Sequence, residues 1–282
     1  MSAAKTCFFG CAFPVLMVLI LGTLFYTQAQ EYTGTDIENK IATVRRKVAR
    51  ALDPKVKAVL QNNQPVPILM YHFIRDNVDE VADSLGYRLS VPEAEFRAQM
   101  SYLKQQGYTT INFDSFLSGH YPAKSVILTF DDGYRDFRDV AYPVLKQNGF
   151  TATTFVITGR LKDPNHLNAT DVQFLAANGI EIGSHSVSHI NLSNANRAKL
   201  RAELNDSRAT LEQLINRPVV ALNYPAGQYN DLTVEMAGRA GYEVAVTTNE
   251  GIASPNNMLT LPRVRIRRGI SIAEFAALLQ SH

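Results

Sequence analysis

Short apolar runs alternate with longer amphipathic stretches from residue 65 to the C-terminus. Runs rich in β-branched and aromatic residues predict strands, and stretches with apolar residues three or four apart predict helices. This repetition of strand and helix predicts an α/β fold with a parallel sheet, either open or closed into a barrel. The predicted strands cover residues 68–73, 108–112, 125–131, 151–157, 180–184, 219–224, 242–248 and 262–267. The predicted helices cover residues 92–106, 135–148, 170–178, 195–215, 231–240 and 271–280.

The chain before residue 65 has a different pattern. Residues 8–26 form an apolar run without a charge, preceded by Lys5, which is typical of a signal peptide or a membrane anchor. We predict that residues 1–30 are such a segment, and the length of the run favours an anchor. Residues 31–64 are charged and have helical periodicity, which predicts a stalk. The remaining residues, 65–282, form the exported domain, so its predicted location is extracellular, at the cell surface or secreted.

Composition narrows the class of protein. A length of 282 residues with 46% hydrophobic residues suits one sizeable globular domain. The net charge is +2, and no basic run with interleaved aromatic residues occurs, so nothing favours a nucleic acid as partner. Both cysteines, Cys7 and Cys11, lie in the apolar N-terminal run, so the exported domain has no disulfide to form.

Two adjacent carboxylates end one of the predicted strands. In the segment SVILTFDDGY, Asp131 and Asp132 follow a β-branched run and precede Gly133, which permits a sharp turn. The C-terminal edge of parallel strands is where α/β proteins build their active sites. A turn held by local hydrogen bonds is the other interpretation of DDG, so this pair alone does not establish a site.

Two histidines follow the end of another predicted strand. In EIGSHSVSH, His185 and His189 are four residues apart, so they face the same way on a turn of helix or in a tight loop. One carboxylate and two imidazoles, with an open position for water, form a recognised catalytic metal site. A histidine pair by itself is more often a surface or core feature. The two segments together therefore carry the hypothesis of a metal site.

TFDDG followed by HSVSH resembles the first two motifs of the polysaccharide deacetylase family, also called the NodB-homology family or carbohydrate esterase family four. The segments PILMYHFI, AYPVLKQNGFTATTFVITG, NYPAGQYND and LPRVRI are similar, in that order, to the intercellular-adhesion-type poly-N-acetylglucosamine deacetylases of this family. The resemblance covers residues 65–282. It implies a distorted (β/α) barrel of about seven strands.

The resemblance implies a role for each motif residue. Asp132, His185 and His189 bind a divalent metal, and Asp131 is the general base that takes a proton from the attacking water. Zinc is the default ion for this donor set, and cobalt, nickel or iron are also accepted.

The chain departs from the usual family pattern at two positions. The late catalytic histidine of the family is missing, and the resemblance implies that His72 protonates the leaving amine; a structural histidine under a loop is the alternative. The arginine that often precedes the proline of the third motif is also missing. Arg263 is the candidate to hold the base bidentately, although Arg265 and Arg267 alternate with it and any of the three could face solvent.

Four further positions are implied in substrate binding. The backbone N–H of Tyr224 is the implied oxyanion donor. Tyr134, Tyr71 and Leu222 are candidates to line the sugar site, with an ordinary core position as an equal alternative.

These inferences predict a metal-dependent enzyme that removes acetyl groups from N-acetylglucosamine units of a surface polysaccharide. The β-1,6-linked adhesion polymer of biofilms is the first candidate substrate. Peptidoglycan, chitin oligomers or an O-acetylated glycan are the alternatives, because the loops that shape a substrate groove are hidden in a single sequence. A non-catalytic glycan-binding protein is the alternative from another class. The intact motifs argue against it, since a binder has no need of both a free and a ligating carboxylate.

Overall fold

The computed structural model of the chain describes residues 64–280. The predicted membrane segment, residues 1–30, lies outside the described residues, and so does the predicted stalk apart from Gln64. Within the described part, no helix has the length and apolar character needed to cross a bilayer. The roles of the first two parts of the chain therefore stay predictions.

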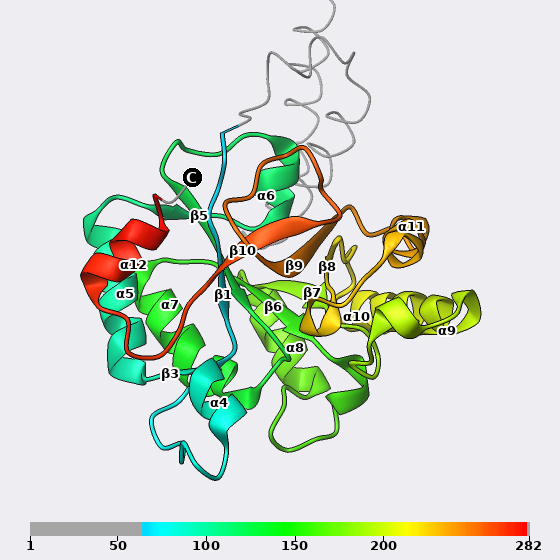
Figure 1. The fold of residues 1–282 in the computed structure, drawn as a ribbon, viewed down its shortest axis with the longest axis horizontal. Coiled ribbons are helices and arrows are strands. Elements are labelled where there is room, and N and C mark those ends of the chain that lie inside the picture. Colours follow the sequence, from blue (N-terminus) through cyan, green and yellow to red (C-terminus); the bar gives the residue numbers. More distant parts are fainter. Residues whose placement is uncertain (1–63, 281–282) are drawn as a thin grey trace, which may run out of the picture. The chain divides into compact units, whose positions relative to one another are not determined.

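Seven parallel strands close into a barrel. The described strands are Ile68–Tyr71 (β1), Phe73–Ile74 (β2), Ser90–Val91 (β3), Thr109–Thr110 (β4), Ser125–Phe130 (β5), Thr153–Val156 (β6), Glu181–Ser184 (β7), Ala221–Asn223 (β8), Val244–Glu250 (β9) and Leu261–Arg265 (β10). Around the barrel the order is β1, β10, β9, β8, β7, β6 and β5, and β5 pairs again with β1 (Figure 1). β4 lies beside β5 and pairs in parallel with its first two residues, while β2 and β3 form a separate pair. The distorted barrel of seven strands that the family resemblance implies is confirmed.

Helices connect the strands and cover the outside of the barrel (Figure 1). The α-helices are Ser84–Leu89 (α4), Glu93–Gln105 (α5), Phe113–Ser118 (α6), Tyr142–Asn148 (α7), Ala169–Ala177 (α8), Arg197–Arg201 (α9), Ser207–Ile215 (α10), Asp231–Arg239 (α11) and Ile272–Leu278 (α12). The predicted helices 135–148 and 195–215 each contain a π-helical stretch, Phe137–Ala141 and Ala202–Asp206. Short 3₁₀ turns cover Thr158–Arg160, Leu192–Asn194 and Pro225–Gly227.

Local signals set the helix ends. α7 ends at Gly149, whose φ of 74° is a left-handed conformation that glycine adopts without a steric penalty. α8 begins with a capping box between Asn168 and Asp171. The sequence patterns do not predict α4 and α6, because each has only six residues and lacks a full amphipathic period.

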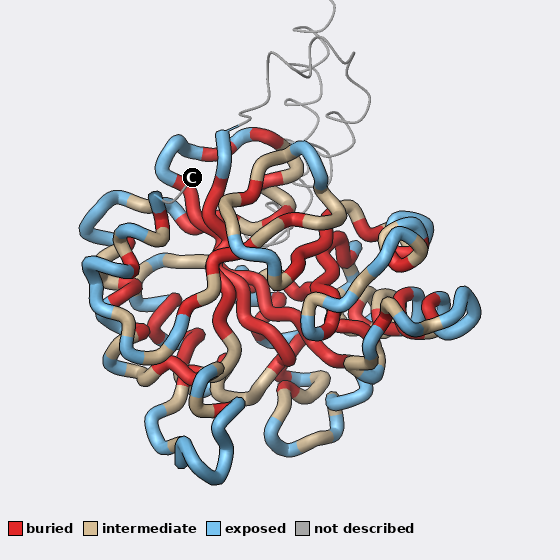
Figure 2. The backbone as a smooth tube through the Cα atoms, viewed as in Figure 1, coloured by how far each residue is buried: buried red, intermediate tan, exposed pale blue. Residues whose placement is uncertain are grey.

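The strands divide their side chains between two cores. Outward residues such as Leu128 and Phe130 pack with the helices in the outer core. Inward residues such as Ile68 and Ile127 pack with Phe113 of α6 in a smaller inner core, which fills the N-terminal end of the barrel. Figure 2 shows the strands buried at the centre and exposed loops at the periphery. The N-terminal end of the barrel is therefore sealed by apolar side chains.

The inward positions become polar toward the C-terminal ends of the strands, a region that we call the mouth. On β5, Ile127 is followed at alternate positions by Thr129 and Asp131, and on β10 Leu261 is followed by Arg263. All of these polar side chains are buried. The alternation that fills the inner core with apolar groups thus also delivers polar groups to one end of the barrel.

Candidate active site

A tight turn at the end of β5 separates the two carboxylates. The N–H of Asp131 donates to the Tyr71 carbonyl at 3.0 Å, which extends the pairing of β5 with β1 by one residue. Asp132 then has a φ of 69°, and Gly133 also has a φ of 69°. A Cβ on Gly133 would lie 3.2 Å from Val156 Cα, so glycine is required by both conformation and space. Asp132 consequently turns away from its neighbour and faces the loop after β7.

Arg263 holds Asp131 through two parallel hydrogen bonds. Its Nη1 donates to Oδ1 at 2.7 Å and its Nη2 donates to Oδ2 at 2.8 Å. The guanidinium is itself fixed by Thr129 Oγ1 at 3.0 Å, the Thr247 carbonyl at 2.8 Å and Asn223 Oδ1 at 3.2 Å. Arg263 is fully buried, so this pair forms in a medium where charge-assisted bonds are strong. Of the three arginines that alternate along this strand, Arg263 is the one that reaches the carboxylate.

The environment keeps Asp131 ionised. Burial alone would raise the pKa of this carboxyl, but the positive charge and hydrogen bonds of Arg263, together with His72, hold the pKa below its ordinary value. Asp131 is therefore available as a base at neutral pH.

His72 lies beside the same carboxylate. Its Nε2 is 3.6 Å from Asp131 Oδ2, too long for a hydrogen bond but within reach of a small movement. Burial lowers the pKa of His72, and the nearby guanidinium groups of Arg263 and Arg265 lower it further, against the opposing effect of the two aspartates. The side chain remains 14% exposed, so it lines the mouth rather than the sealed interior.

Three ligand atoms converge on the other side of the mouth. Asp132 Oδ1 is 3.3 Å from His185 Nε2 and 3.3 Å from His189 Nε2, and the three atoms lie within 4.8 Å of one another. Ligands bound to a tetrahedral zinc ion at about 2.0–2.1 Å would be roughly 3.3 Å apart, so the two distances from Asp132 fit a metal ion of this size. Burial would raise the pKa of Asp132, but the two imidazoles hold it well below its ordinary value.

The orientation of His185 also fits metal binding. Its Nδ1 lies 2.8 Å from the Asn223 carbonyl. Because a carbonyl only accepts, Nδ1 carries the hydrogen and the Nε2 lone pair faces Asp132. A metal-binding histidine commonly has its other ring nitrogen fixed in this way.

The two histidines lie in a loop, not on a helix. Ser186 and His189 have φ values of 62° and 55°, which are uncommon for residues with a side chain. The buried Glu203 holds the loop by accepting from the N–H groups of Val187 at 2.9 Å and Ser188 at 2.8 Å. Glu203 lies in the π-helical stretch Ala202–Asp206, a departure from regular helix that is frequent at functional sites.

Two predicted site residues lie in the outer core, and the N–H group of a third already has an acceptor. Tyr71 and Leu222 are fully buried in the outer core, because they occupy outward positions of their strands. The Tyr71 hydroxyl donates to Gln99 at 2.8 Å, so neither residue lines a sugar site and the alternative of an ordinary core position is correct. The N–H of Tyr224, the implied oxyanion donor, donates to the Val246 carbonyl at 3.3 Å and is not free in this structure.

Tyr134 does lie at the mouth. Its ring stacks on Phe73 with centroids 3.7 Å apart and contacts His166 at 4.9 Å. Burial, together with the charge of Asp132, raises the pKa of the Tyr134 hydroxyl, so this group stays protonated as a donor.

Several residues that fix the site have no role implied by the sequence motifs. They act through other groups: Thr129, Asn223 and Thr247 hold Arg263, and Glu203 holds the histidine loop. Thr129 has a signal in the sequence, because it is a polar residue in an apolar strand two positions before Asp131. Glu203 has none, since its partners are remote backbone N–H groups.

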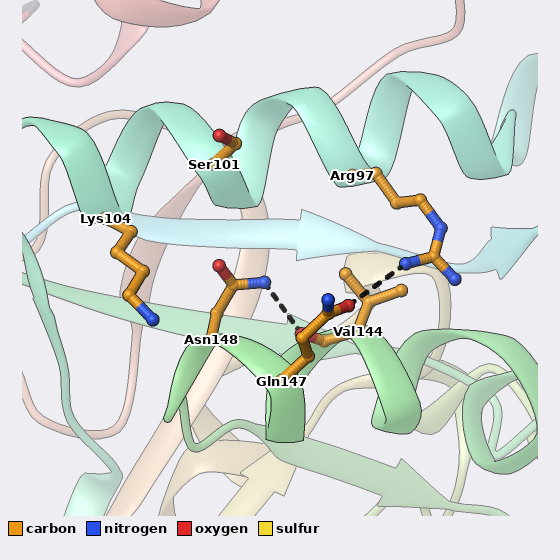
Figure 3. Close-up of a pocket in the computed structure, with 6 residues that line it drawn as sticks. All are labelled: Arg97, Ser101, Lys104, Val144, Gln147 and Asn148. Atoms are coloured by element: carbon orange, nitrogen blue, oxygen red, sulfur yellow. Dashed lines mark hydrogen bonds between the residues drawn. The ribbon is translucent and has the colours of Figure 1, made fainter.

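A separate groove lies in the helical layer between α5 and α7 (Figure 3). It has a volume of about 290 Å³ and is lined by Arg97, Ser101, Lys104, Val144, Gln147 and Asn148. Arg97 donates to Gln147 at 3.4 Å, and Asn148 donates to the Val144 carbonyl at 2.8 Å. Its lining residues include no carboxylate or imidazole, in contrast to those of the mouth.

The sequence and the structure are both similar to those of known proteins. The family model for polysaccharide deacetylase matches residues 118–245. YxkH of Bacillus subtilis, whose name places it among the polysaccharide deacetylases, is 34% identical over 252 residues, which are 86% of this chain and 85% of that protein. The poly-beta-1,6-N-acetyl-D-glucosamine N-deacetylase of Staphylococcus aureus is 28% identical over 196 residues, which are 63% of this chain and 68% of that enzyme.

Solved structures share the fold. The deacetylase PplD of Streptococcus pyogenes, in complex with acetate, superimposes with a TM-score of 0.72 and 34% identity over 77% of this chain and 99% of that chain. IcaB from Ammonifex degensii superimposes with a TM-score of 0.66 at 21% identity, over 78% of this chain and 99% of that chain, which supports the fold alone. The chain therefore belongs to the polysaccharide deacetylase family and is a polysaccharide deacetylase.

Proposed function

We propose that this enzyme removes acetyl groups from N-acetylglucosamine units of an extracellular polysaccharide, with poly-β-1,6-N-acetylglucosamine as the first candidate. One observation carries the proposal: two adjacent carboxylates have opposite partners. Asp131 is held by Arg263 at 2.7 and 2.8 Å, whereas Asp132 faces two imidazole nitrogens at 3.3 Å. Metal-assisted hydrolysis of an amide uses such a pair, in which one carboxylate is a free base and the other is a metal ligand. The likeness to the staphylococcal enzyme supports the choice of polymer.

The proposal assigns a role to each residue of the mouth. Asp132, His185 and His189 hold a divalent ion, with zinc as the default and cobalt, nickel or iron as alternatives. When bound, the ion polarises the acetyl carbonyl and lowers the pKa of the attacking water. Asp131 takes a proton from that water while the water oxygen bonds to the acetyl carbon. Arg263 keeps the Asp131 carboxylate oriented.

His72 supplies the other proton. As the C–N bond breaks, the leaving nitrogen takes a proton from the protonated form of His72, which becomes neutral, and the products are a free amine on the sugar and acetate. The support for this role is the position of His72, which lines the mouth beside Asp131. Tyr134 is the residue of the mouth that we assign to contact with the sugar.

We also propose a location. The apolar run of residues 8–26 exports the domain and anchors it at the cell surface, unless the run is cleaved. Fractionation of cells followed by N-terminal sequencing of the protein tests this, and an unprocessed chain in the cytoplasm would contradict it.

Mass spectrometry of purified glycans tests the reaction and the substrate. The enzyme is incubated with defined oligomers of β-1,6-N-acetylglucosamine, with peptidoglycan fragments and with chitin oligomers. We expect loss of acetyl groups from the β-1,6 oligomer and none with the Asp131→Asn variant. Turnover of peptidoglycan or chitin alone would overturn the choice of polymer, and no turnover of any glycan by the metal-loaded enzyme would overturn the reaction.

A further inference from the structure

Arg265 is a partly buried cation at the mouth, next to the residues of the proposed reaction. It is the last residue of β10, two positions after Arg263, so strand alternation puts both side chains on the inward face. In the pairing of β1 with β10, Arg265 lies opposite Met70, and His72 follows two residues later on the same face of the chain. Arg265 and His72 therefore flank the mouth from neighbouring strands.

The Arg265 guanidinium forms no ion pair with the residues that the structure describes, although the charges of Asp131 and Glu250 act on it from a distance. Asp131 is already held by Arg263, and Glu250 accepts from the backbone N–H of Arg265 while its carboxylate lies 3.9 Å from Arg267. Within residues 64–280, no side chain or carbonyl accepts a hydrogen bond from the Arg265 side chain. Burial lowers the pKa of Arg265, and the neighbouring charge of Arg263 lowers it further, while the charges of Asp131 and Glu250 offset only part of this effect.

The contrast with Arg263 shows what is missing. The Arg263 guanidinium has acceptors for its nitrogens on four residues, whereas Arg265 has the same five N–H donors and no acceptor on the described residues. Desolvating a cation is costly unless it is paired, and a guanidinium matches a carboxylate in shape and charge. The side chain also remains partly exposed at the open end of the barrel, where a ligand has access.

We propose that Arg265 binds a carboxylate at the mouth, beside the amide that is cleaved. The inference rests on the proposed function, because it places this anion next to the sugar in the site. Two sources share the chemistry: an acidic substituent on a neighbouring sugar of the glycan, and the acetate that the reaction releases. In either case Arg265 supplies affinity for an anion, which the metal ligands and the base do not provide for a neutral sugar.

Binding titrations separate the two sources. Calorimetry is done with metal-loaded enzyme in the Asp131→Asn background, which leaves the glycan acetylated. The ligands are a neutral N-acetylglucosamine oligomer, an oligomer of equal length in which N-acetylmuramic acid supplies carboxylates, and sodium acetate. The variants are Arg265→Gln, Arg265→Lys and, as a matched control, Arg267→Gln. The Arg267 side chain is 69% exposed and lies two residues beyond the end of β10.

We expect Arg265→Gln to reduce the preference for the acidic over the neutral oligomer, or the affinity for acetate, by about tenfold or more, because charge-assisted bonds are lost. Arg265→Lys retains part of the effect, since it keeps the charge without the planar fork. Arg267→Gln leaves both quantities at the level of the background enzyme. A reduced preference identifies the glycan as the source, and weaker acetate binding identifies the product.

The proposal is overturned if Arg265→Gln changes neither quantity. It is also overturned if Arg267→Gln changes them equally, because the effect would then come from the overall positive charge near the mouth and not from one binding site. Deacetylation of the neutral oligomer by the enzyme with Asp131 intact is measured separately. Failure of that reaction counts against the proposed function, whereas unchanged titrations count against the carboxylate site alone.

Discussion

Two carboxylates at opposite ends of the barrel meet opposite electrostatic conditions. Asp131 at the mouth has a bidentate guanidinium, and its pKa lies below the ordinary value. Glu181 begins β7 at the N-terminal end, and burial, reinforced by the charge of Asp114, raises its pKa to about 7. Glu181 accepts from the N–H groups of Phe113 at 3.0 Å and Asp114 at 3.2 Å, which ties α6 to the barrel.

The difference shows that burial alone does not identify a catalytic acid or base. Both carboxylates leave water, and both accept hydrogen bonds, but Asp131 accepts two charge-assisted hydrogen bonds from Arg263, whereas Glu181 has the charge of Asp114 nearby. Hydrogen bonds from neutral groups offset part of the desolvation of Glu181, and the remainder appears as a raised pKa. One carboxylate is thus kept charged at the mouth, while the other attaches α6 to the barrel.

The largest effect is expected from the metal side of the mouth. His185→Ala removes one of three ligand atoms and should abolish both metal binding and turnover, with a loss of activity of roughly 10⁴-fold or more. Metal content by mass spectrometry and a deacetylation assay measure the two effects. Full turnover by a metal-free variant would show that the site is not catalytic.

A smaller loss should follow removal of the base. Asp131→Asn keeps the shape of the side chain but cannot take a proton, so turnover should fall by roughly 10²–10⁴-fold. Metal content should stay at the level of the unchanged enzyme, because Asp132 and the histidines are intact. Loss of metal in this variant would place Asp131 among the ligands and remove the distinction between the two aspartates.

Removing the cation should make the mouth resemble the other end of the barrel. Arg263→Met leaves Asp131 buried without its partner, which should destabilise the fold by about 3–5 kcal/mol in chemical denaturation. Burial then dominates, so the pKa of Asp131 should rise above its ordinary value of 3.8. The acid limb of the pH–activity profile should consequently move to higher pH.

Arg263→Lys is the control for that variant. It keeps a positive charge without the bidentate geometry, so both effects should be smaller. An acid limb that stays in place in Arg263→Met would show that another group controls the ionisation of the base.

The smallest effect concerns Glu181. Its pKa rises from 4.5 to about 7 on folding, so its stabilising contribution is complete below pH 4.5 and is lost as the pH rises through about 7. Glu181→Gln should remove this pH dependence, a difference of at most roughly 3 kcal/mol. Unfolding measured across this pH range checks it, and turnover at fixed pH should be unchanged. A large loss of turnover would contradict a purely structural role.

The sequence patterns predicted most of the barrel, because strands that are buried on both faces have continuous apolar sequences. The predicted strand 125–131 and the observed Ser125–Phe130 differ by one residue, and the predicted helix 92–106 and the observed Glu93–Gln105 by one at each end. The short helices α4 and α6 depend on contacts with remote residues, such as the bond from Phe113 to Glu181, and local patterns carry no record of such contacts.

The motifs also indicated the metal ligands and the two candidates that replace missing family residues, although the roles stay proposals. The sequence did not distinguish the positions that line the sugar site from ordinary core positions. Tyr71 and Leu222 flank inward-facing residues, and a shift of one position along a strand turns a side chain from the mouth to the outer core. Aromatic or apolar character does not reveal that choice, because it suits both environments.

The amino-acid sequence by itself determined the parallel α/β order, the family and the residues able to ligate a metal, since these follow from periodicity and motif spacing. Only the tertiary structure decided which arginine of LPRVRI meets Asp131, and that the two histidines lie in a strained loop held by Glu203. It also decided that the Arg265 side chain forms no hydrogen bond or ion pair within residues 64–280. Each of these depends on barrel closure, which brings β10 beside β1 and β1 beside β5. Distances between such segments are set by packing of the whole chain, and no local pattern encodes them.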